Sequence, residues 1–190
     1  MELTEAIKGR RSIRRYTSQP VDDKTLNIIL EAARQAPSWA NTQCWRFIVV
    51  RDSKLKNKLA DTAIEVTTGK LNRGGEAIRI TPVAIVACAQ VRKAGYYASG
   101  GEGPVTDKGD WYMYDVALAM QNLTLAAHAL GLGTVHIGAF DAIKVAEILG
   151  VPEGFAVVAM TPLGYPDEEP NPRPRKELSE IVSYDKFGFE

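Results

Sequence analysis

Residues 113–130 place the strongest constraint on the fold, because this segment is apolar on nearly every side when it is read as a helix. Ala, Leu, Met and Val recur on all of its faces at 3.6 residues per turn. Such a helix suits the centre of a domain or a surface that a partner chain covers. Polar residues such as Gln121, Thr124 and His128 interrupt the apolar run, which is too short or too interrupted to span about 30 Å of hydrocarbon. We therefore expect a buried or subunit-covered helix and no membrane span.

Apolar residues recur at i, i+3, i+4 and i+7 in three other segments and indicate amphipathic helices. The first runs from Asp23 to Ala36. The second follows Ser53 and reaches Ala63. The third spans residues 142–149, with Asp141 as its N-cap and Gly150 as its stop.

Short apolar runs rich in β-branched residues lie between these helices and predict buried strands. They are Phe47 to Val50, Val83 to Cys88, Val135 to Ile137 and Phe155 to Met160. Because strands alternate with helices over 190 residues, the pattern favours one α/β or α+β domain. From Tyr165 onward, frequent prolines forbid a packed helix and favour an extended arm that embraces a partner.

The overall charge argues against two classes of function. Lys and Arg number 23 and Asp and Glu also number 23, whereas a general nucleic-acid or membrane-surface binder carries a basic excess. The N-terminus lacks the apolar core of a secretory signal, so we expect a cytoplasmic protein. Cys44 and Cys88 lack metal-ligand spacing, and we expect no metal site.

Basic residues nevertheless cluster near both ends of the chain. Arg10, Arg11 and Arg14 surround Ser12 in the sequence RRSIR, and Arg173 and Arg175 lie in the C-terminal arm. Guanidinium groups pair with phosphate oxygens in bidentate geometry and the serine adds a hydroxyl donor, so RRSIR is suited to a phosphate monoester. The alternative is a solvated basic turn and a basic tail.

A second candidate site is the loop that begins at Pro37. Hydroxyl and amide side chains follow this helix stop, and Trp45 then opens a strand, so the loop can hydrogen-bond the polar edge of a heterocycle. The alternative is an ordinary helix-to-strand connection. The glycines of residues 131–138 close a helix and precede a strand, which is the wrong order for a dinucleotide fingerprint.

Histidine and aromatic residues leave further alternatives. His128 suits a packed or interfacial position, whereas His136 alternates with apolar neighbours and can face a ligand. Trp111 and Tyr114 suit a core, or stacking on a flat ligand beside the Gly-rich loop at 96–110. No serine or cysteine lies in a nucleophile-elbow sequence, so hydrolase chemistry lacks a nucleophile.

Four motifs taken together resemble the FMN-dependent nitroreductase family. They are RRSIRRY at 10–16, APSWANTQCWRFIVV at 36–50, GLGTVHIGAF at 131–140 and LGYPDEEPNPRPRK at 163–176. Their order and spacing agree with that family over nearly the whole chain. The resemblance implies an α+β, three-layer fold with a central, mainly antiparallel sheet flanked by helices. It also implies an intertwined homodimer, in which residues 165–190 of the single domain form an arm that packs on the partner subunit.

The resemblance also implies the positions that hold the cofactor. Arg10, Arg11 and Ser12 would bind the FMN phosphate or ribityl chain, and Arg14 would approach the flavin N1 and O2 edge. The second subunit would bring Pro37, Ser38, Trp39 and Asn41 over the flavin. The segment His136, Ile137 and Gly138 would place the Gly138 N–H near N5, and Arg173 and Arg175 would supply the C-terminal basic pair.

The implied activity is an FMN-dependent oxidoreductase that takes hydride from NADH or NADPH. It would reduce a nitroaromatic, a quinone or another small electrophilic acceptor in ping-pong order, with the flavin and not a side chain carrying the hydride. The alternatives are a flavin-binding module without turnover, a relative with dehalogenase or flavin-modifying activity, and a basic-arm protein that binds a nucleic acid or an acidic partner.

Two features depart from the family pattern. Cys44 stands where the family usually has proline before the tryptophan. A basic residue that the family often supplies to the flavin cannot be assigned among Lys70, Asn72 and Arg73.

Overall fold

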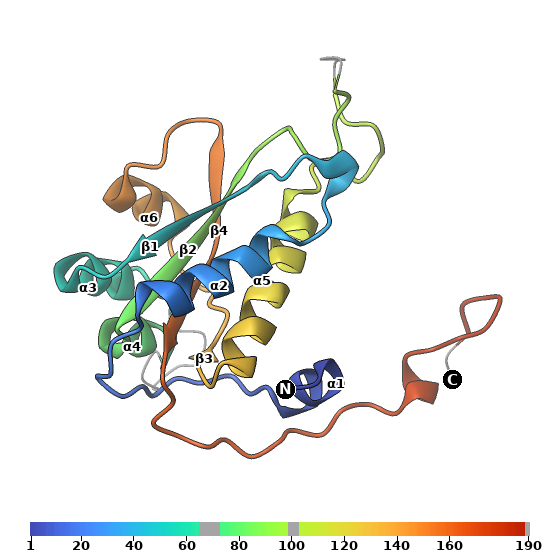
Figure 1. Ribbon diagram of the computed structural model, residues 1–190. Helices are drawn as coiled ribbons and strands as arrows, with labels where there is room; N and C mark the ends of the chain where they lie inside the picture. The colour runs from blue at the N-terminus through green and yellow to red at the C-terminus, as the bar shows by residue number, and fades with distance from the viewer. Residues whose placement is uncertain (65–72, 99–102, 189–190) are drawn as a thin grey trace.

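The computed structural model describes residues 1–64, 73–98 and 103–188, and its centre is a four-stranded antiparallel sheet. The strand order is β1-β2-β4-β3, and helices lie on both faces (Figure 1). The strands are β1 (Trp45–Val50), β2 (Val83–Gln90), β3 (Gly133–Thr134) and β4 (Phe155–Gly164). This arrangement confirms the α+β class and the mainly antiparallel sheet that the resemblance implies, where the residue pattern alone left α/β or α+β open.

Strand β2 shows why the fold has three layers. Successive side chains of a strand point to opposite faces, and β2 is apolar at both sets of positions. Val83, Ile85 and Ala87 join the core beneath α2 (Asp23–Arg34) and α5 (Tyr112–Ala129). Ala84 and Val86 join the core on the other face. That second core is covered by α3 (Ser53–Asp61), α4 (Arg73–Ile80) and α6 (Ala142–Leu149).

Helix α5 is buried along one side only. Val116, Ala119, Met120 and Leu123 pack in the core, whereas Met113 and Tyr114 are 56% and 57% exposed. The protomer therefore leaves apolar side chains of α5 uncovered, as expected of a helix that a partner chain covers. Among the described helices, none combines the length and hydropathy needed to cross a bilayer.

The helix ends follow local chemistry that the sequence signals. The carboxylates of Asp22, Asp52 and Asp141 accept hydrogen bonds from N–H groups in the first turns of α2, α3 and α6. Gly150 ends α6 with φ of 65°, a conformation that favours glycine. The predicted cap and stop of α6 are therefore confirmed.

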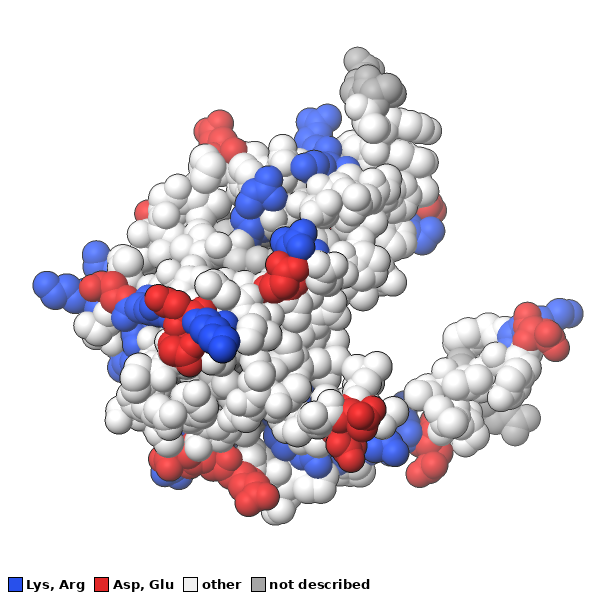
Figure 2. All heavy atoms as spheres, viewed as in Figure 1, with Lys and Arg blue, Asp and Glu red and all other residues white. Residues whose placement is uncertain are grey.

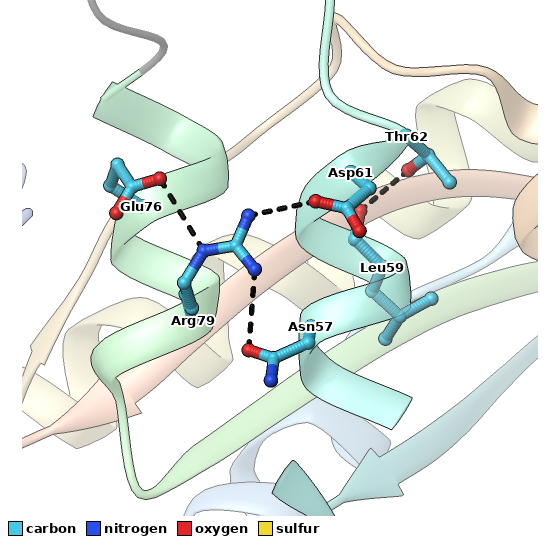
Figure 3. A network of polar contacts seen from close by, with 6 residues as sticks. All are labelled: Asn57, Leu59, Asp61, Thr62, Glu76 and Arg79. Atoms are coloured by element: carbon cyan, nitrogen blue, oxygen red, sulfur yellow. Dashed lines mark hydrogen bonds and ion pairs between the residues drawn. The ribbon is translucent and has the colours of Figure 1, made fainter. Parts of the chain in front are cut away.

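An arginine joins α3 to α4 on the outer face (Figure 3). The Arg79 guanidinium donates to Asp61 Oδ1 at 2.8 Å, to Asn57 Oδ1 at 3.3 Å and to Glu76 Oε1 at 3.4 Å. Because these groups are partly exposed, each contact contributes at most about 1 kcal/mol. The network joins two short helices, and none of its residues lines the pocket described below.

Some sequence-based boundaries are wrong. The strand expected at 135–137 is β3 at Gly133–Thr134, and Ile137 forms only an isolated bridge with Met160. Ala63 lies beyond the end of α3, where it pairs with Phe140. In both places, a β-bridge to a distant segment determines where the regular element ends. The spacing of apolar residues within one segment cannot predict such a bridge.

Two of the described α-helices have no counterpart in the sequence-based prediction. Helix α1 (Leu3–Gly9) is only 7 residues long, and α4 contains two adjacent glycines near its start. Short length and glycine both weaken a helical signal. Packing of Ala77 and Ile78 against the sheet stabilises α4 despite its sequence.

The chain after β4 forms the extended arm that the prolines predict. Its first residues pair with the N-terminal segment, since the Thr17 N–H donates to the Tyr165 carbonyl at 3.0 Å and the Asp167 N–H donates to the Arg15 carbonyl at 2.9 Å. The rest, including the short helix η2 (Leu178–Glu180), projects away from the body (Figure 1). Leu178 is 73% exposed and Tyr184 is 87% exposed.

Candidate functional site

A pocket of about 270 Å³ lies where the N-terminal segment crosses the end of β3 and the middle of α5. Its lining residues are Arg10, Ser12, Arg14, Gln121, Thr124, Thr134, Val135 and His136. Four residues that were predicted from two distant motifs, Arg10, Ser12, Arg14 and His136, therefore lie around one cavity.

Backbone pairing places the three N-terminal residues. The Ile13 N–H donates to the Thr134 carbonyl at 2.9 Å, and Ser12 bridges Thr134 in parallel. Ile13 is buried against Gly133, where a Cβ atom would lie 2.6 Å from the Ile13 side chain. Because extended backbone alternates its side chains, burial of Ile13 turns Ser12 and Arg14 toward the pocket.

The pocket is positively charged. Burial, then Arg175 and then Arg11 lower the pKa of Arg10, so three guanidinium groups lie near one another. No described carboxylate forms an ion pair with Arg10, Arg11 or Arg14. Cations that lie together without counterions favour binding of an anion.

Glu168 is the acid that lies against this segment, and it contacts the backbone. Its carboxylate accepts from the Arg14 N–H at 2.5 Å and from the Arg15 N–H at 3.2 Å. The arm therefore fixes the path of the N-terminal segment. The Arg14 guanidinium makes a long contact of 3.4 Å with the Ser12 carbonyl.

His136 is oriented by two threonines. Its Nε2 lies 2.8 Å from Thr124 Oγ1, and Thr134 Oγ1 donates to Thr124 Oγ1 at 3.4 Å. His136 is an exposed residue by its accessible surface. Desolvation by the surrounding protein and the nearby Arg10 nevertheless lower the pKa of His136, which favours the neutral imidazole. Thr124 and Gln121 interrupt the apolar sequence of α5, and sequence reasoning did not assign them to the site.

Arg11 takes a different direction from Arg10. Its Nη1 donates to the carbonyls of Lys8 at 2.7 Å and Arg10 at 2.9 Å. The side chain lines a second cavity of about 530 Å³, between α1, the end of α5 and the start of the arm. Burial, Arg10 and Arg11 lower the pKa of His128, which borders this second cavity.

The loop at 38–44 contains backbone strain. Ala40, Asn41 and Gln43 have φ values of 42°, 55° and 47°, a region that non-glycine residues rarely adopt. The short helix η1 (Trp39–Asn41) forms its tip, where Asn41 is exposed, as is Pro37 before the loop. Ser38 and Trp39 are partly buried.

One protomer does not bring this loop and the pocket together. The loop contacts Asp115 in the first turn of α5, whereas Thr124 lines the pocket. The two positions are nine residues apart along the helix, which corresponds to about 13 Å along the axis. Figure 1 shows η1 at the upper right and α1 at the opposite end of the molecule.

The remaining predicted residues lie at the rim or on the arm. Ile137 exchanges two backbone hydrogen bonds with Met160, and Gly138 after it is exposed. Arg173 and Arg175 are exposed on the arm, and the effect of Arg175 on Arg10 places it near the pocket. Lys70 and Asn72 lie outside the described residues, and Arg73 is the exposed first residue of α4.

An aromatic cluster lies beside the strained loop. The Trp39 and Trp111 rings are 5.5 Å apart, and the Trp111 and Tyr114 rings are 5.3 Å apart in edge-to-face geometry. Trp111 Nε1 is buried and has no hydrogen-bond partner among the described residues. The cluster joins the loop to the start of α5, and its exposed side offers a stacking surface.

Comparisons with known proteins agree with one another. The sequence model of the nitroreductase family matches residues 7–165. A nitroreductase family protein from Clostridium novyi NT is 35% identical with a TM-score of 0.76, and the match covers 100% of this chain and 96% of that one. An FMN-dependent nitroreductase from Clostridium difficile R20291 is 29% identical with a TM-score of 0.77, covering 97% and 99%.

Curated relatives differ in their named activities. An NADPH-flavin oxidoreductase of Vibrio harveyi is 30% identical, and the match covers 96% of this chain and 73% of the relative. An iodotyrosine deiodinase of Thermotoga neapolitana is 29% identical, covering 97% and 98%. The similarity therefore extends over nearly the whole chain, whereas the acceptor varies among relatives.

Proposed function

The chain belongs to the nitroreductase family, and from this premise we propose that it is an FMN-dependent oxidoreductase. It takes electrons from NADH or NADPH and passes them, in ping-pong order, to a nitroaromatic, a quinone or another small electrophilic acceptor. The observation that carries the proposal is the pocket in which Arg10, Ser12, Arg14 and His136 converge. Similarity to proteins named as NADPH-flavin and FMN-dependent enzymes supports it.

The donors around the pocket fit a flavin mononucleotide. A phosphate monoester needs cations and hydroxyl donors, and Arg10, Arg175 and Ser12 supply both without competition from an ion-paired carboxylate. Arg11 and Arg173 are proposed to extend this basic surface. Bound FMN would supply the electron chemistry, so that the protein supplies binding, orientation and electrostatics.

Arg14 and Gly138 are proposed to act on the ring system. The Arg14 backbone is held by Glu168, and Arg14 lines the pocket. A fixed cation stabilises negative charge that develops beside it. The Gly138 N–H donates no hydrogen bond to another described residue, which leaves it available to a ligand.

We further propose a homodimer in which each site contains residues of both subunits. Exposed apolar residues of α5 and of the arm, among them Met113, Leu178 and Ile181, lack enough partners within one chain. Figure 2 shows the edge of the body along α5 as largely uncharged, and the arm as a separate projection. The partner would supply Pro37, Ser38, Trp39 and Asn41 over the flavin, while residues 1–190 act as one domain whose arm, 165–190, embraces that partner.

Anaerobic titration tests the proposed activity. The purified protein should be yellow and bind FMN, and NADH or NADPH should bleach the flavin absorbance, which a nitroaromatic or a quinone then restores. A colourless protein that binds no FMN would contradict the proposal, and binding without bleaching would identify a passive flavin-binding module. Iodinated tyrosine in the acceptor panel tests the deiodinase alternative. The cytoplasmic location stays a prediction.

A further inference from the structure

The carboxylate of Asp115 is buried beneath the loop at 38–44, and no cation neutralises it. Asp115 is 1% exposed, and no ion pair joins it to a described lysine, arginine or histidine. It is also the only charged residue between 113 and 130. Burial of an unpaired carboxylate is costly, and that cost indicates a role beyond filling the core.

Among the described residues, the hydrogen-bond partners of this carboxylate all lie in the loop. The Trp39 N–H donates to both oxygens at 3.1 Å. Thr42 Oγ1 lies 3.5 Å from Oδ2, and Cys44 Sγ lies 3.7 Å from the same oxygen. One side chain of α5 therefore contacts the loop at its start, middle and end.

The contacts hold the loop where its backbone is strained. Ala40, Asn41 and Gln43, the three residues with positive φ, lie between or beside the donors. Such conformations persist only where surrounding structure determines them. Two loop hydrogen bonds help: the Thr42 N–H donates to the Trp39 carbonyl at 2.8 Å and the Gln43 N–H donates to Ser38 Oγ at 3.0 Å. Asp115 makes the side-chain hydrogen bonds from α5 to this loop, and the ring contact of Trp39 with Trp111 lies beside them.

We propose that Asp115 is a positioning residue for the cofactor site, because its carboxylate holds the loop in the shape that presents Trp39 and Asn41 to the flavin of the partner subunit. The proposal rests on the proposed function for the identity of the ligand. Asp115 itself is buried beneath the loop, whereas the tip at Ala40 and Asn41 is exposed.

Three variants separate positioning from general stability. Asp115→Asn keeps an acceptor for the Trp39 N–H and gives Thr42 Oγ1 a donor, so it should keep the loop in place. Asp115→Leu removes every acceptor. Asn122→Ala is the matched control, because Asn122 also joins α5 to a backbone group, the Ala32 carbonyl at 3.2 Å, but lies away from the loop.

The first readout is amide exchange of the apoprotein, which needs no cofactor. In Asp115→Leu, amides 39–43 should exchange at least about tenfold faster while β1 and the rest of α5 keep their protection, as for loss of hydrogen bonds to a charged acceptor. Asp115→Asn should stay within about threefold of wild type. Asp115→Ser, which shortens the acceptor, takes the place of the leucine variant if that variant does not fold.

The second readout is the affinity of the apoprotein for FMN. Asp115→Leu should raise the FMN Kd about tenfold or more, while Asp115→Asn restores it and Asn122→Ala leaves it unchanged. Protected loop amides together with wild-type affinity in Asp115→Leu would overturn the proposal, as would an equal loss of affinity in Asn122→Ala. If the wild type binds no FMN, the proposed function fails, and amide exchange alone decides whether Asp115 holds the loop.

Discussion

The pocket at the N-terminal segment and the loop at 38–44 contain candidate cofactor residues that are held in opposite ways. In the pocket, regular backbone pairing with β3 supports cationic side chains that lack ion-paired partners. In the loop, the buried carboxyl group of Asp115, whose pKa is raised by burial, supports a strained backbone through neutral donors. The pocket is therefore suited to bind a charged group, and the loop is suited to contact a ligand through its fixed conformation.

The largest effect is expected when an arginine proposed to bind the FMN phosphate is removed. Arg10→Ala or Arg175→Ala should raise the FMN Kd about ten- to a hundredfold, because charge-assisted hydrogen bonds contribute about 1.5 to 3 kcal/mol each. Riboflavin, which lacks the phosphate, should lose little affinity. Fluorescence titration with both ligands measures this difference.

The matched control is Lys8→Ala, which removes a neighbouring cation that does not line the pocket. Asp115→Leu should raise the Kd of FMN and the Kd of riboflavin by similar factors, because the loop is proposed to lie over the flavin, which both ligands contain. Equal losses for both ligands in Arg10→Ala would show that the arginine does not read the phosphate and would erase the distinction between the two regions.

A smaller effect is expected at Arg14. Reduction puts negative charge on the flavin edge, so a fixed cation favours the reduced state more than the oxidised one. If Arg14→Gln removes about 1 to 2 kcal/mol of this preference, the two-electron midpoint falls by about 20 to 45 mV, since about 30 mV corresponds to 1.4 kcal/mol. Spectroelectrochemical titration of the FMN-saturated variant checks the value. An unchanged or higher midpoint would remove Arg14 from this role.

The smallest expected effect is the pH dependence of stability at His136. Its pKa in the folded apoprotein is lowered from 6.5 by desolvation and by Arg10. Below about pH 6.5 the unfolded chain binds a proton that the folded ring resists, so stability falls as pH decreases through this window and is fully present above it. His136→Gln should reduce that fall. Urea denaturation at pH 7.5 and pH 5 measures it, and identical pH dependence in both proteins would contradict the prediction.

The residues that line the pocket are easier to recognise in the sequence than the contacts that support the loop. Arg10, Ser12 and Arg14 have a chemistry that can be read from residue types, and their spacing of two residues matches the extended backbone that the structure shows. The role of Asp115 was not predicted, because it depends on contacts across 71 to 76 residues of chain. Its isolation in an otherwise uncharged segment was the available signal.

The same contrast applies to the fold. Helices α2 and α6 follow from periodicity and end signals, and α5 and β2 follow from their apolar runs. The short strand β3 and the bridge at Ile137 depend on pairing with β4, which no local pattern reports. Local physics therefore predicts the layers, and long-range pairing decides where the pocket forms.

The central claim is that the pocket of one subunit and the loop of its partner form each site. Doubly tagged heterodimers test it, with Arg10→Ala in one subunit and Trp39→Ala with Asn41→Ala in the other. Both parent homodimers serve as controls and should bind FMN weakly. If each site combines the pocket of one subunit with the loop of the other, all three substitutions fall in one site and the second site is unchanged. Titration should then show one FMN per dimer bound with wild-type affinity. If neither site of the heterodimer bound FMN with wild-type affinity, the pocket and the loop would act within the same protomer, and the central claim would be wrong.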